Sequence, residues 1–308
     1  MEENPVPRRR REWPGRIATL AAMLIGIIVV LYPVAATFYN NYHATQFAKK
    51  YEHSPDNQVN ERTRDMLSKA QSFNAAMPPS TLVDPWRAAD PANNDHYQYY
   101  LKQVSPKSQA MGRLRIPSIN VELPFFHTTT DEALAQGAGH VYGTSLPVGG
   151  PSTHAALAAH RGLPQSTMFD RVPQMKVGDD MFIDILGETH AYRVVSVETV
   201  LPDDIKSLQK VEGKDLLTLI TCTPYGINTH RLLVTGERIP LEQAPQKAWE
   251  LGFDWTIQPW MRWPIAGAVV SLLLMAWLLA RWIRADRRAR RAGRSTALHP
   301  RIAAEAVG

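Results

Sequence analysis

Cys222 is the only cysteine in this 308-residue chain, and its surroundings favour a reactive thiol. It follows the apolar segment "LLTLIT", residues 216–221, and precedes the turn "TPYG", residues 223–226. A thiol at the end of a strand that faces a loop is accessible to a substrate. The alternative is a small buried side chain, which is the common role of a free cysteine. The polar neighbours Thr221 and Thr223 argue against a wholly apolar setting.

A nucleophilic thiol needs a proton acceptor and positive potential nearby, because the thiolate is the attacking species. His160, in "HAALAAHRGLP", lies where an apolar segment gives way to a glycine loop, so we expect it at the exit of another strand. The chain has ten histidines, and position in the sequence alone does not single out one of them. The nearest competitors are His140, His154 and His230.

Arg231 begins the segment "RLLVTGERI", nine residues after the cysteine. If residues 216–221 and 231–236 pair as a hairpin, Cys222 and Arg231 lie at the same end of that hairpin. The guanidinium could then donate hydrogen bonds to a developing oxyanion. Without a cysteine opposite, the same residue would be interpreted as a solvated arginine at the start of a strand.

Short β segments dominate the chain from Gly112 onward and predict an all-β sandwich or barrel. Turns rich in Gly, Pro and Asp separate them. The segments are 112–126, 154–160, 180–186, 190–200, 216–221 and 231–239. Residues 130–140 predict one short helix, with Thr130 or Asp131 as its N-cap and Gly137 at its end.

Two segments of different character precede the β region. Residues 40–76 are polar with spaced apolar positions, and "HSPDN" at 53–57 divides them, so we expect a two-piece helical stalk. Packing of these helices on the domain is compatible with that expectation. Residues 77–108 contain several prolines, asparagines and aspartates, which argue against any regular element. A loop of this length is usually either functional or disordered.

Two apolar runs, 17–38 and 263–282, are each long enough to cross a membrane, which takes about 20 apolar residues. Arginines precede the first run and follow the second, so the positive-inside rule places both termini in the cytoplasm and residues 39–262 outside. The alternative for the first run is a signal peptide cleaved near Val34–Ala36. The length of the first apolar run exceeds the 7–15 residues of a typical signal-peptide core, and this favours an uncleaved membrane anchor.

The net charge of +5 comes from the ends of the chain and does not indicate nucleic-acid binding. Residues 1–16 carry a net charge of +2 and residues 281–308 carry +6, which leaves −3 for the middle of the chain. The basic ends therefore fit the flanks of membrane anchors.

Two long stretches resemble sortases. "TLITCTPYGINTHRLLVTG", residues 218–236, resembles the sortase signature in which a TLxTC segment carries the nucleophile and a downstream arginine completes the site. "GHVYGTSLPVGGPSTHAALAAHRGLP", residues 139–164, resembles the segment with the catalytic histidine. The pair before that histidine is Ala158-Ala159, where Ser-Gly or Thr-Gly is frequent. "DPW", residues 84–86, resembles the lid motif of class C, the pilus-assembling sortases.

The resemblance implies a role for each matching residue. Cys222 would be the nucleophile, His160 the general acid/base and Arg231 the oxyanion-stabilising or substrate-orienting group. Thr221 would line the site and help the oxyanion hole. The lid would consist of Asp84, Pro85 and Trp86, with Asp84 paired to Arg231 by charge and the Trp86 ring packed over the Cys222 sulfur.

The implied fold is the eight-stranded sortase β-barrel with short helices, a helical stalk and two transmembrane helices. The expected divisions are a basic tail (1–16), a transmembrane helix (17–39), the stalk (40–76), the lid loop (77–108), the catalytic barrel (109–241), a linker (242–262), a second transmembrane helix (263–283) and a second basic tail (284–308).

The implied function is a cysteine transpeptidase that needs no cofactor or metal. It would cleave an LPxTG-like sorting signal between Thr and Gly through a thioester on Cys222. A lysine of another pilin subunit would resolve the thioester, which builds covalent pili on a Gram-positive surface. The alternative is a housekeeping sortase that uses a cell-wall precursor amine. A papain-like protease fits less well because its cysteine precedes its histidine. A tethered scaffold with a structural thiol is the non-enzymatic alternative.

Overall fold

The computed structural model describes residues 13–77, 84–85, 95–105, 109–163, 165–204, 206–244 and 257–305, with side chains of the last helix described through residue 289. Residues 36–255 form one compact unit. Residues 1–35 and 256–308 form a second. The expected Trp86 and the linker residues 245–256 lie outside the described residues.

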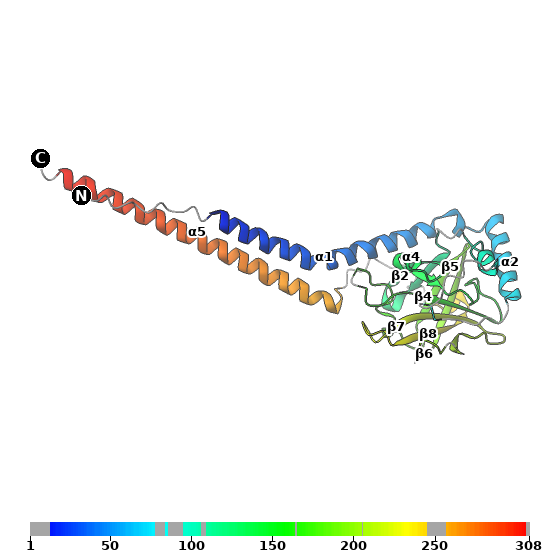
Figure 1. The fold of residues 1–308 in the computed structure, drawn as a ribbon. Coiled ribbons are helices and arrows are strands. Elements are labelled where there is room, and N and C mark those ends of the chain that lie inside the picture. Colours follow the sequence, from blue (N-terminus) through cyan, green and yellow to red (C-terminus); the bar gives the residue numbers. More distant parts are fainter. Residues whose placement is uncertain are drawn as a thin grey trace. The chain divides into compact units, whose positions relative to one another are not determined.

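Eight strands close into a barrel in the order β1-β2-β3-β4-β7-β8-β6-β5, which confirms the predicted fold class. Figure 1 labels β2, β4, β5, β6, β7 and β8 of this barrel. Their bounds are Gly112–Ile116 (β1), Val121–His127 (β2), Ala138–His140 (β3), Thr153–Ala158 (β4), Asp180–Ile185 (β5), Glu188–Val200 (β6), Asp215–Thr223 (β7) and His230–Ile239 (β8). Most neighbours are antiparallel, whereas β2 with β3 and β4 with β7 are parallel.

The barrel interior is filled by the alternate apolar residues that the β pattern predicted. Leu157 of β4, Leu217 and Leu219 of β7 and Val234 of β8 are fully buried in the main core. On the opposite face of the same strands, a smaller apolar cluster contains Ala158, Ile220 and Leu233. Side chains of a strand alternate between faces, so each strand here contributes to both clusters.

Local signals explain how the β segments begin and end. Residues 112–126 form two strands rather than one, because Pro117 begins a short 3-10 turn and Asn120 adopts a left-handed conformation (φ 48°) after it. The predicted short helix is present as α4, Asp131–Gln136, with Thr130 as N-cap and Gly137 as C-cap. Strand β3 directly follows that helix and was not predicted, since three residues are too few to show a period.

The two helices before the barrel pack on it. Helix α1 runs from Trp13 to Glu52, and α2 from Glu61 to Ala76, with a break at the predicted "HSPDN" segment. Asn60 caps α2, because its side chain accepts a hydrogen bond from the backbone N–H of Thr63. Residues from both helices are buried against the barrel, among them Ala44 of α1 and Ala70 and Phe73 of α2.

The expectation that residues 77–108 contain no regular element is wrong in one place. Helix α3 spans Asp95–Tyr100 and buries Tyr97 and Tyr100. The Tyr100 hydroxyl lies 2.9 Å from Nδ1 of His140 and accepts a hydrogen bond from the backbone N–H of Thr128. Burial of two aromatic side chains and a satisfied buried hydroxyl stabilise a six-residue helix that local propensity alone would leave unformed.

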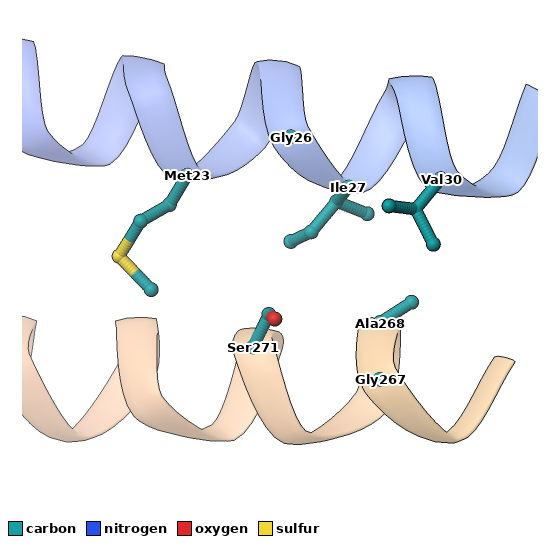
Figure 2. Close-up of a pocket in the computed structure, with 7 residues that line it drawn as sticks. All are labelled: Met23, Gly26, Ile27, Val30, Gly267, Ala268 and Ser271. Carbon is teal, nitrogen blue, oxygen red and sulfur yellow. The ribbon is translucent and has the colours of Figure 1, made fainter. Parts of the chain in front are cut away.

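The second unit contains two helices that are long and apolar enough to cross a membrane. They are the first part of α1 and helix α5, Arg262–Glu305. Arg16 of α1 donates hydrogen bonds to Asp286 of α5 at 3.2 Å. Between the helices lies a cavity of about 340 Å³, into which Met23, Ile27 and Val30 point from α1 (Figure 2). Ala268 and Ser271 line it from α5.

Candidate active site

Three neighbouring strands bring the predicted triad together. Cys222 lies within β7, one residue beyond the predicted strand, and pairs directly with Arg231 at the start of β8. The predicted hairpin is therefore present. On its other side β7 pairs in parallel with β4, where Ala158 lies opposite Ile220. His160 lies two residues beyond Ala158, past the end of β4, and Cys222 lies two residues beyond Ile220 on β7.

Cys222 and Arg231 share one face of the sheet. Ile220 and Leu233 belong to one apolar cluster, and each is two residues from Cys222 and Arg231, respectively. Because the side-chain period of a strand is two, Cys222 and Arg231 project on the same face as that cluster. The backbone N–H of Ala159 donates to the carbonyl of Ile220 at 3.2 Å, which continues the strand pairing up to His160.

Thr221 faces the other way from Cys222. It is fully buried, and its hydroxyl donates a 2.9 Å hydrogen bond to the carbonyl of Ala159. Ala159 immediately precedes His160, so this bond ties the histidine segment to the cysteine strand. The contact favours a positioning role for Thr221 over direct donation by its hydroxyl to an oxyanion.

Asp84 forms the ion pair with Arg231 that the sequence predicted. The Nε of Arg231 donates to one carboxylate oxygen at 2.7 Å, and the second terminal nitrogen donates to the other oxygen at 2.8 Å. The remaining terminal nitrogen donates to the carbonyls of Asn228 and His230 at 3.1 Å. Thr129 also holds this segment, since its hydroxyl donates to the carbonyl of Pro85 at 2.7 Å.

These contacts have an electrostatic consequence for Arg231. Burial disfavours its charged form, but the hydrogen bonds to Asp84 and the negative charges near it outweigh burial and raise the pKa of Arg231 above its ordinary value. The guanidinium is therefore a permanent cation beside the thiol. In this arrangement it directs its donors to Asp84 and to backbone carbonyls.

Cys222 is 7% exposed, and its thiol lies among charges of both signs. Burial raises its pKa above the ordinary value, and Asp84 acts in the same direction. Arg231 and Arg161 oppose this and favour the thiolate. Burial lowers the pKa of His160, while Asp131 raises it. With Asp84 in place, the Cys222 thiol and the His160 imidazole thus both favour their neutral forms.

Arg161 is a site residue that the sequence analysis did not identify. Its guanidinium donates to the carbonyl of Cys222 at 3.4 Å and to the hydroxyl of Thr223 at 3.2 Å. It also lies 5.6 Å from the centre of the Tyr225 ring. Arg161 directly follows His160 in the sequence, which is the one sequence feature that could have identified it as a site residue. The strand that its side chain reaches depends on the pairing of β4 with β7.

Two of the competing histidines have structural partners. His140 is fully buried between Tyr100 and the carbonyl of Ser145, and burial lowers its pKa to about 4. His154 lies between the carbonyl of Gln209 and the hydroxyl of Thr218. His230 lies within hydrogen-bond distance of the Thr229 hydroxyl and precedes Arg231, so it projects on the opposite face of β8.

Comparison with known proteins connects this geometry to one family. The sortase domain model matches residues 114–239. Sortase C-1 of Actinomyces oris is 46% identical, with a TM-score of 0.57 over 59% of this chain and 100% of that one. Sortase C of Streptococcus pneumoniae, whose crystal structure is described in terms of catalysis and pilin substrate specificity, is 37% identical, with a TM-score of 0.56 over 63% and 97%. Sortase A of Bacillus anthracis is 32% identical over 43% of this chain, a match that spans 61% of that relative.

Proposed function

We propose, on the premise that this chain belongs to the sortase family of cysteine transpeptidases and resembles its class C members, that it joins pilin subunits through a thioester on Cys222. The substrate would carry an LPxTG-like sorting signal, and the acceptor would be a lysine amine of another subunit. The observation that carries the proposal is the direct pairing of Cys222 on β7 with Arg231 on β8, next to β4, which ends two residues before His160, with Asp84 bound to the arginine.

In the first step, with the lid open, the Cys222 thiol gives its proton to His160, and the resulting thiolate attacks the threonine carbonyl carbon of the sorting signal. A carbon–sulfur bond forms, and the charge on the carbonyl oxygen is stabilised by Arg231. The carbon–nitrogen bond to glycine then breaks, and His160 gives a proton to the leaving amine. The products of this step are a thioester and a released glycine peptide.

In the second step an acceptor lysine attacks the thioester carbon. An amide bond forms, the carbon–sulfur bond breaks, and the thiolate leaves as the free nucleophile. His160 accepts the proton that the amine loses and returns it to the thiolate, which restores the starting state of both groups. A thioester is sufficiently activated for this transfer, so the step uses only the groups named here.

Asp84 and Pro85 belong to a lid that has to move before this reaction. Asp84 takes a hydrogen bond from Nε and one from a terminal nitrogen of Arg231, so these two donors can bind an oxyanion only after the carboxylate leaves. We extend the proposed lid to Trp86, which lies outside the described residues. The closed lid would limit access to Cys222 before a sorting signal binds.

The two apolar helices support a membrane-tethered enzyme. We propose that both termini lie in the cytoplasm and that the barrel faces outward, because the arginines flank the outer ends of both apolar runs. This topology would keep the active site near membrane-bound pilin precursors.

The test is a reaction of the full chain in detergent micelles with a sorting-signal peptide and a lysine-bearing pilin domain. Intact-mass and peptide mass spectrometry should find an acyl adduct on Cys222 and an isopeptide product. Both should be absent in Cys222→Ala. His160→Ala and Arg231→Ala should each reduce turnover by about 10²–10³-fold, because each removes one stabilising group from the transition state.

Other outcomes separate the alternatives. An adduct that is resolved only by a cell-wall amine mimic would reassign the enzyme to surface-protein anchoring, a function compatible with its similarity to sortase A of Bacillus anthracis. Failure to form an adduct, with Asp84→Ala present as well to release the lid, would contradict a catalytic role for Cys222.

A further inference from the structure

We propose that Asn41 of helix α1 is a positioning residue for His160 and acts through the loop that follows the histidine. The inference rests on the proposed transpeptidase function, to which it adds a residue far from the active-site motifs in sequence. It assigns to α1 a part in completing the active site. Asn41 does not itself contact reacting atoms.

Asn41 binds the histidine loop with both atoms of its amide. Its Nδ2 donates to the hydroxyl of Thr167 at 2.6 Å, and its Oδ1 accepts from the backbone N–H of the same residue at 3.0 Å. The neighbouring Asn40 adds a third contact, since its amide donates to the carbonyl of Gln165 at 2.9 Å. Two consecutive asparagines of α1 thus bond to residues two apart in one loop.

Short backbone contacts connect Thr167 to His160. The carbonyl of Thr167 accepts from the backbone N–H of Asp170 at 2.8 Å. Asp170 in turn accepts a 2.6 Å hydrogen bond from the backbone N–H of Gly162. The backbone N–H of Phe169, which is fully buried, donates to the carbonyl of His160 at 3.1 Å. Any displacement of Thr167 therefore moves residues that bond directly to the histidine segment.

The two sides of His160 are held by different elements. Ala159, before the histidine, is tied to β7 through its N–H and through the Thr221 hydroxyl. The loop after it has the contacts with α1 just described, and Arg171 then donates to the carbonyl of Ile119 at 3.3 Å. The backbone of His160 is thus held by β7 on one side and by a loop bonded to α1 on the other. A small displacement of the imidazole lowers the catalytic rate, because proton transfer needs hydrogen-bond distance.

The contact between Asn41 and Thr167 lies close, along α1, to the apolar run proposed as a membrane anchor. The helix is continuous from Trp13 to Glu52, and its apolar run ends at residue 38, three residues before Asn41. At 1.5 Å per residue, about 5 Å along the helix separates the apolar run from this contact. The same helix that carries the proposed anchor therefore also orders the histidine loop.

The experiment uses the full chain in detergent micelles and compares four variants. Asn41→Ala removes both contacts, and Thr167→Val removes the hydroxyl but keeps the backbone N–H. Asn41→Asp is the rescue, because its carboxylate can accept from both the N–H and the hydroxyl of Thr167. Gln46→Ala is the control, since it removes an exposed amide from the same helix.

We expect Asn41→Ala to lower kcat for sorting-signal turnover by about 10- to 100-fold with KM changed by less than about twofold. Backbone hydrogen exchange in residues 161–170 should accelerate, and the NMR titration midpoint of His160 should move toward its ordinary value as the loop loosens. Thr167→Val should show a smaller effect of the same kind. Asn41→Asp should restore all three readouts, and Gln46→Ala should change none.

Each contrary result has a distinct meaning. Faster exchange with unchanged kcat and an unchanged His160 titration would make Asn41 a structural residue only and overturn the proposal. Unchanged exchange in Asn41→Ala would show that the contact does not order the loop, which overturns it as well. If the unmodified chain shows no turnover, the proposed function fails, while the exchange and the His160 titration still decide whether Asn41 positions the histidine.

Discussion

At the scale of single residues, the reactivity of Cys222 depends on three charges of known position. Arg231 lies opposite it on β8, Asp84 neutralises that arginine, and Arg161 reaches the end of β7 from the residue after His160. Burial and Asp84 raise the pKa of the Cys222 thiol, whereas the two arginines lower it. Removal of different charges should therefore move this pKa in opposite directions.

We predict that Asp84→Asn lowers the pKa of Cys222 and that Arg161→Gln raises it, because Asp84 disfavours the thiolate and Arg161 favours it. The measurement is the rate of alkylation by a small thiol reagent as a function of pH, followed by intact mass. The midpoint of the profile reports the pKa, and its plateau reports access to the thiol. Asp84→Asn should also raise the plateau, as should Trp86→Ala if the lid extends over the sulfur.

Arg161→Lys is the matched control for charge, since it keeps a cation at that position and should leave the midpoint near that of the unmodified chain. Midpoints that move in the same direction in Asp84→Asn and Arg161→Gln would contradict the electrostatic account. A plateau that stays constant in both lid variants would show that the lid does not protect the thiol.

Asp170 gives a second prediction at this scale. Burial raises the pKa of Asp170 from 3.8 to about 6. The hydrogen bond from the Gly162 N–H and the charges of Arg161 and Arg171 lower this pKa, but burial outweighs them. A carboxyl whose pKa is higher in the folded state binds its proton more tightly there than in the unfolded chain. Its contribution to the free energy of unfolding is thus fully present below about pH 4 and is lost as pH rises through about 6.

We therefore expect Asp170→Asn to raise the melting temperature at pH 7.5, because the amide avoids burial of a charge and still accepts from Gly162. A pKa shift of about two units corresponds to at most about 3 kcal/mol in the free energy of unfolding. We expect the substitution to gain roughly 1–2 kcal/mol. The gain should shrink toward pH 4, where the native carboxyl is protonated. Thermal unfolding of both chains across this range tests the prediction, and a gain independent of pH would contradict it.

At the scale of elements, the close approach of the β5–β6 turn to the link between α1 and α2 constrains how the helices sit on the barrel. Gly187 has φ +84°, and a Cβ there would lie 2.8 Å from the nitrogen of Val59 and 3.0 Å from the carbonyl carbon of Gln58. Its backbone N–H also donates to the Asn57 side chain at 3.3 Å. Only glycine combines this conformation with this spacing.

We predict that Gly187→Ala destabilises the barrel unit by about 2–4 kcal/mol, from backbone strain together with the clash. Gly178→Ala is the matched control, because φ there is +98° but a Cβ would meet nothing within 4 Å. Chemical denaturation of both variants separates the two contributions. Equal loss of stability in the two variants would show that the turn does not contact the helix link as described.

At the scale of the whole molecule, the proposed membrane topology of the chain rests on its two apolar helices and its basic ends. The single native cysteine makes this testable, because Cys222→Ala leaves a chain without thiols. We predict that a membrane-impermeant maleimide labels Val177→Cys in intact cells, since Val177 is 66% exposed on the barrel. Ser295→Cys, beyond the second apolar run, should be labelled only after the cells are lysed.

Labelling of Ser295→Cys in intact cells would contradict the placement of the C-terminus in the cytoplasm. An N-terminal epitope tag tests the other end. It should stay attached to the full-length chain, whereas its loss during export would favour the cleaved-signal alternative.

Much of the candidate site and of the fold class was predictable from local patterns. The lone thiol, the histidine and the arginine at strand ends, and the β segments between turn residues are properties of short stretches, as are the apolar runs. Such features depend on side-chain chemistry and on periods of a few residues. They led to the pairing of Cys222 with Arg231 and to the resemblance to sortases, which in turn implied the pairing of Arg231 with Asp84; the structure contains both pairings.

The sequence by itself thus determined the residue types, the strand and helix signals and the family, because each of these is encoded locally. Tertiary structure alone decided which strands are neighbours, and with them that Thr221 faces Ala159, that Arg161 reaches the end of β7, and that Asn41 bonds to the histidine loop. Tertiary structure also decided that α3 forms, because its two buried tyrosines are stabilised by residues far away in the chain. These contacts join residues 28 to 126 positions apart, and their free energy appears only when the barrel closes.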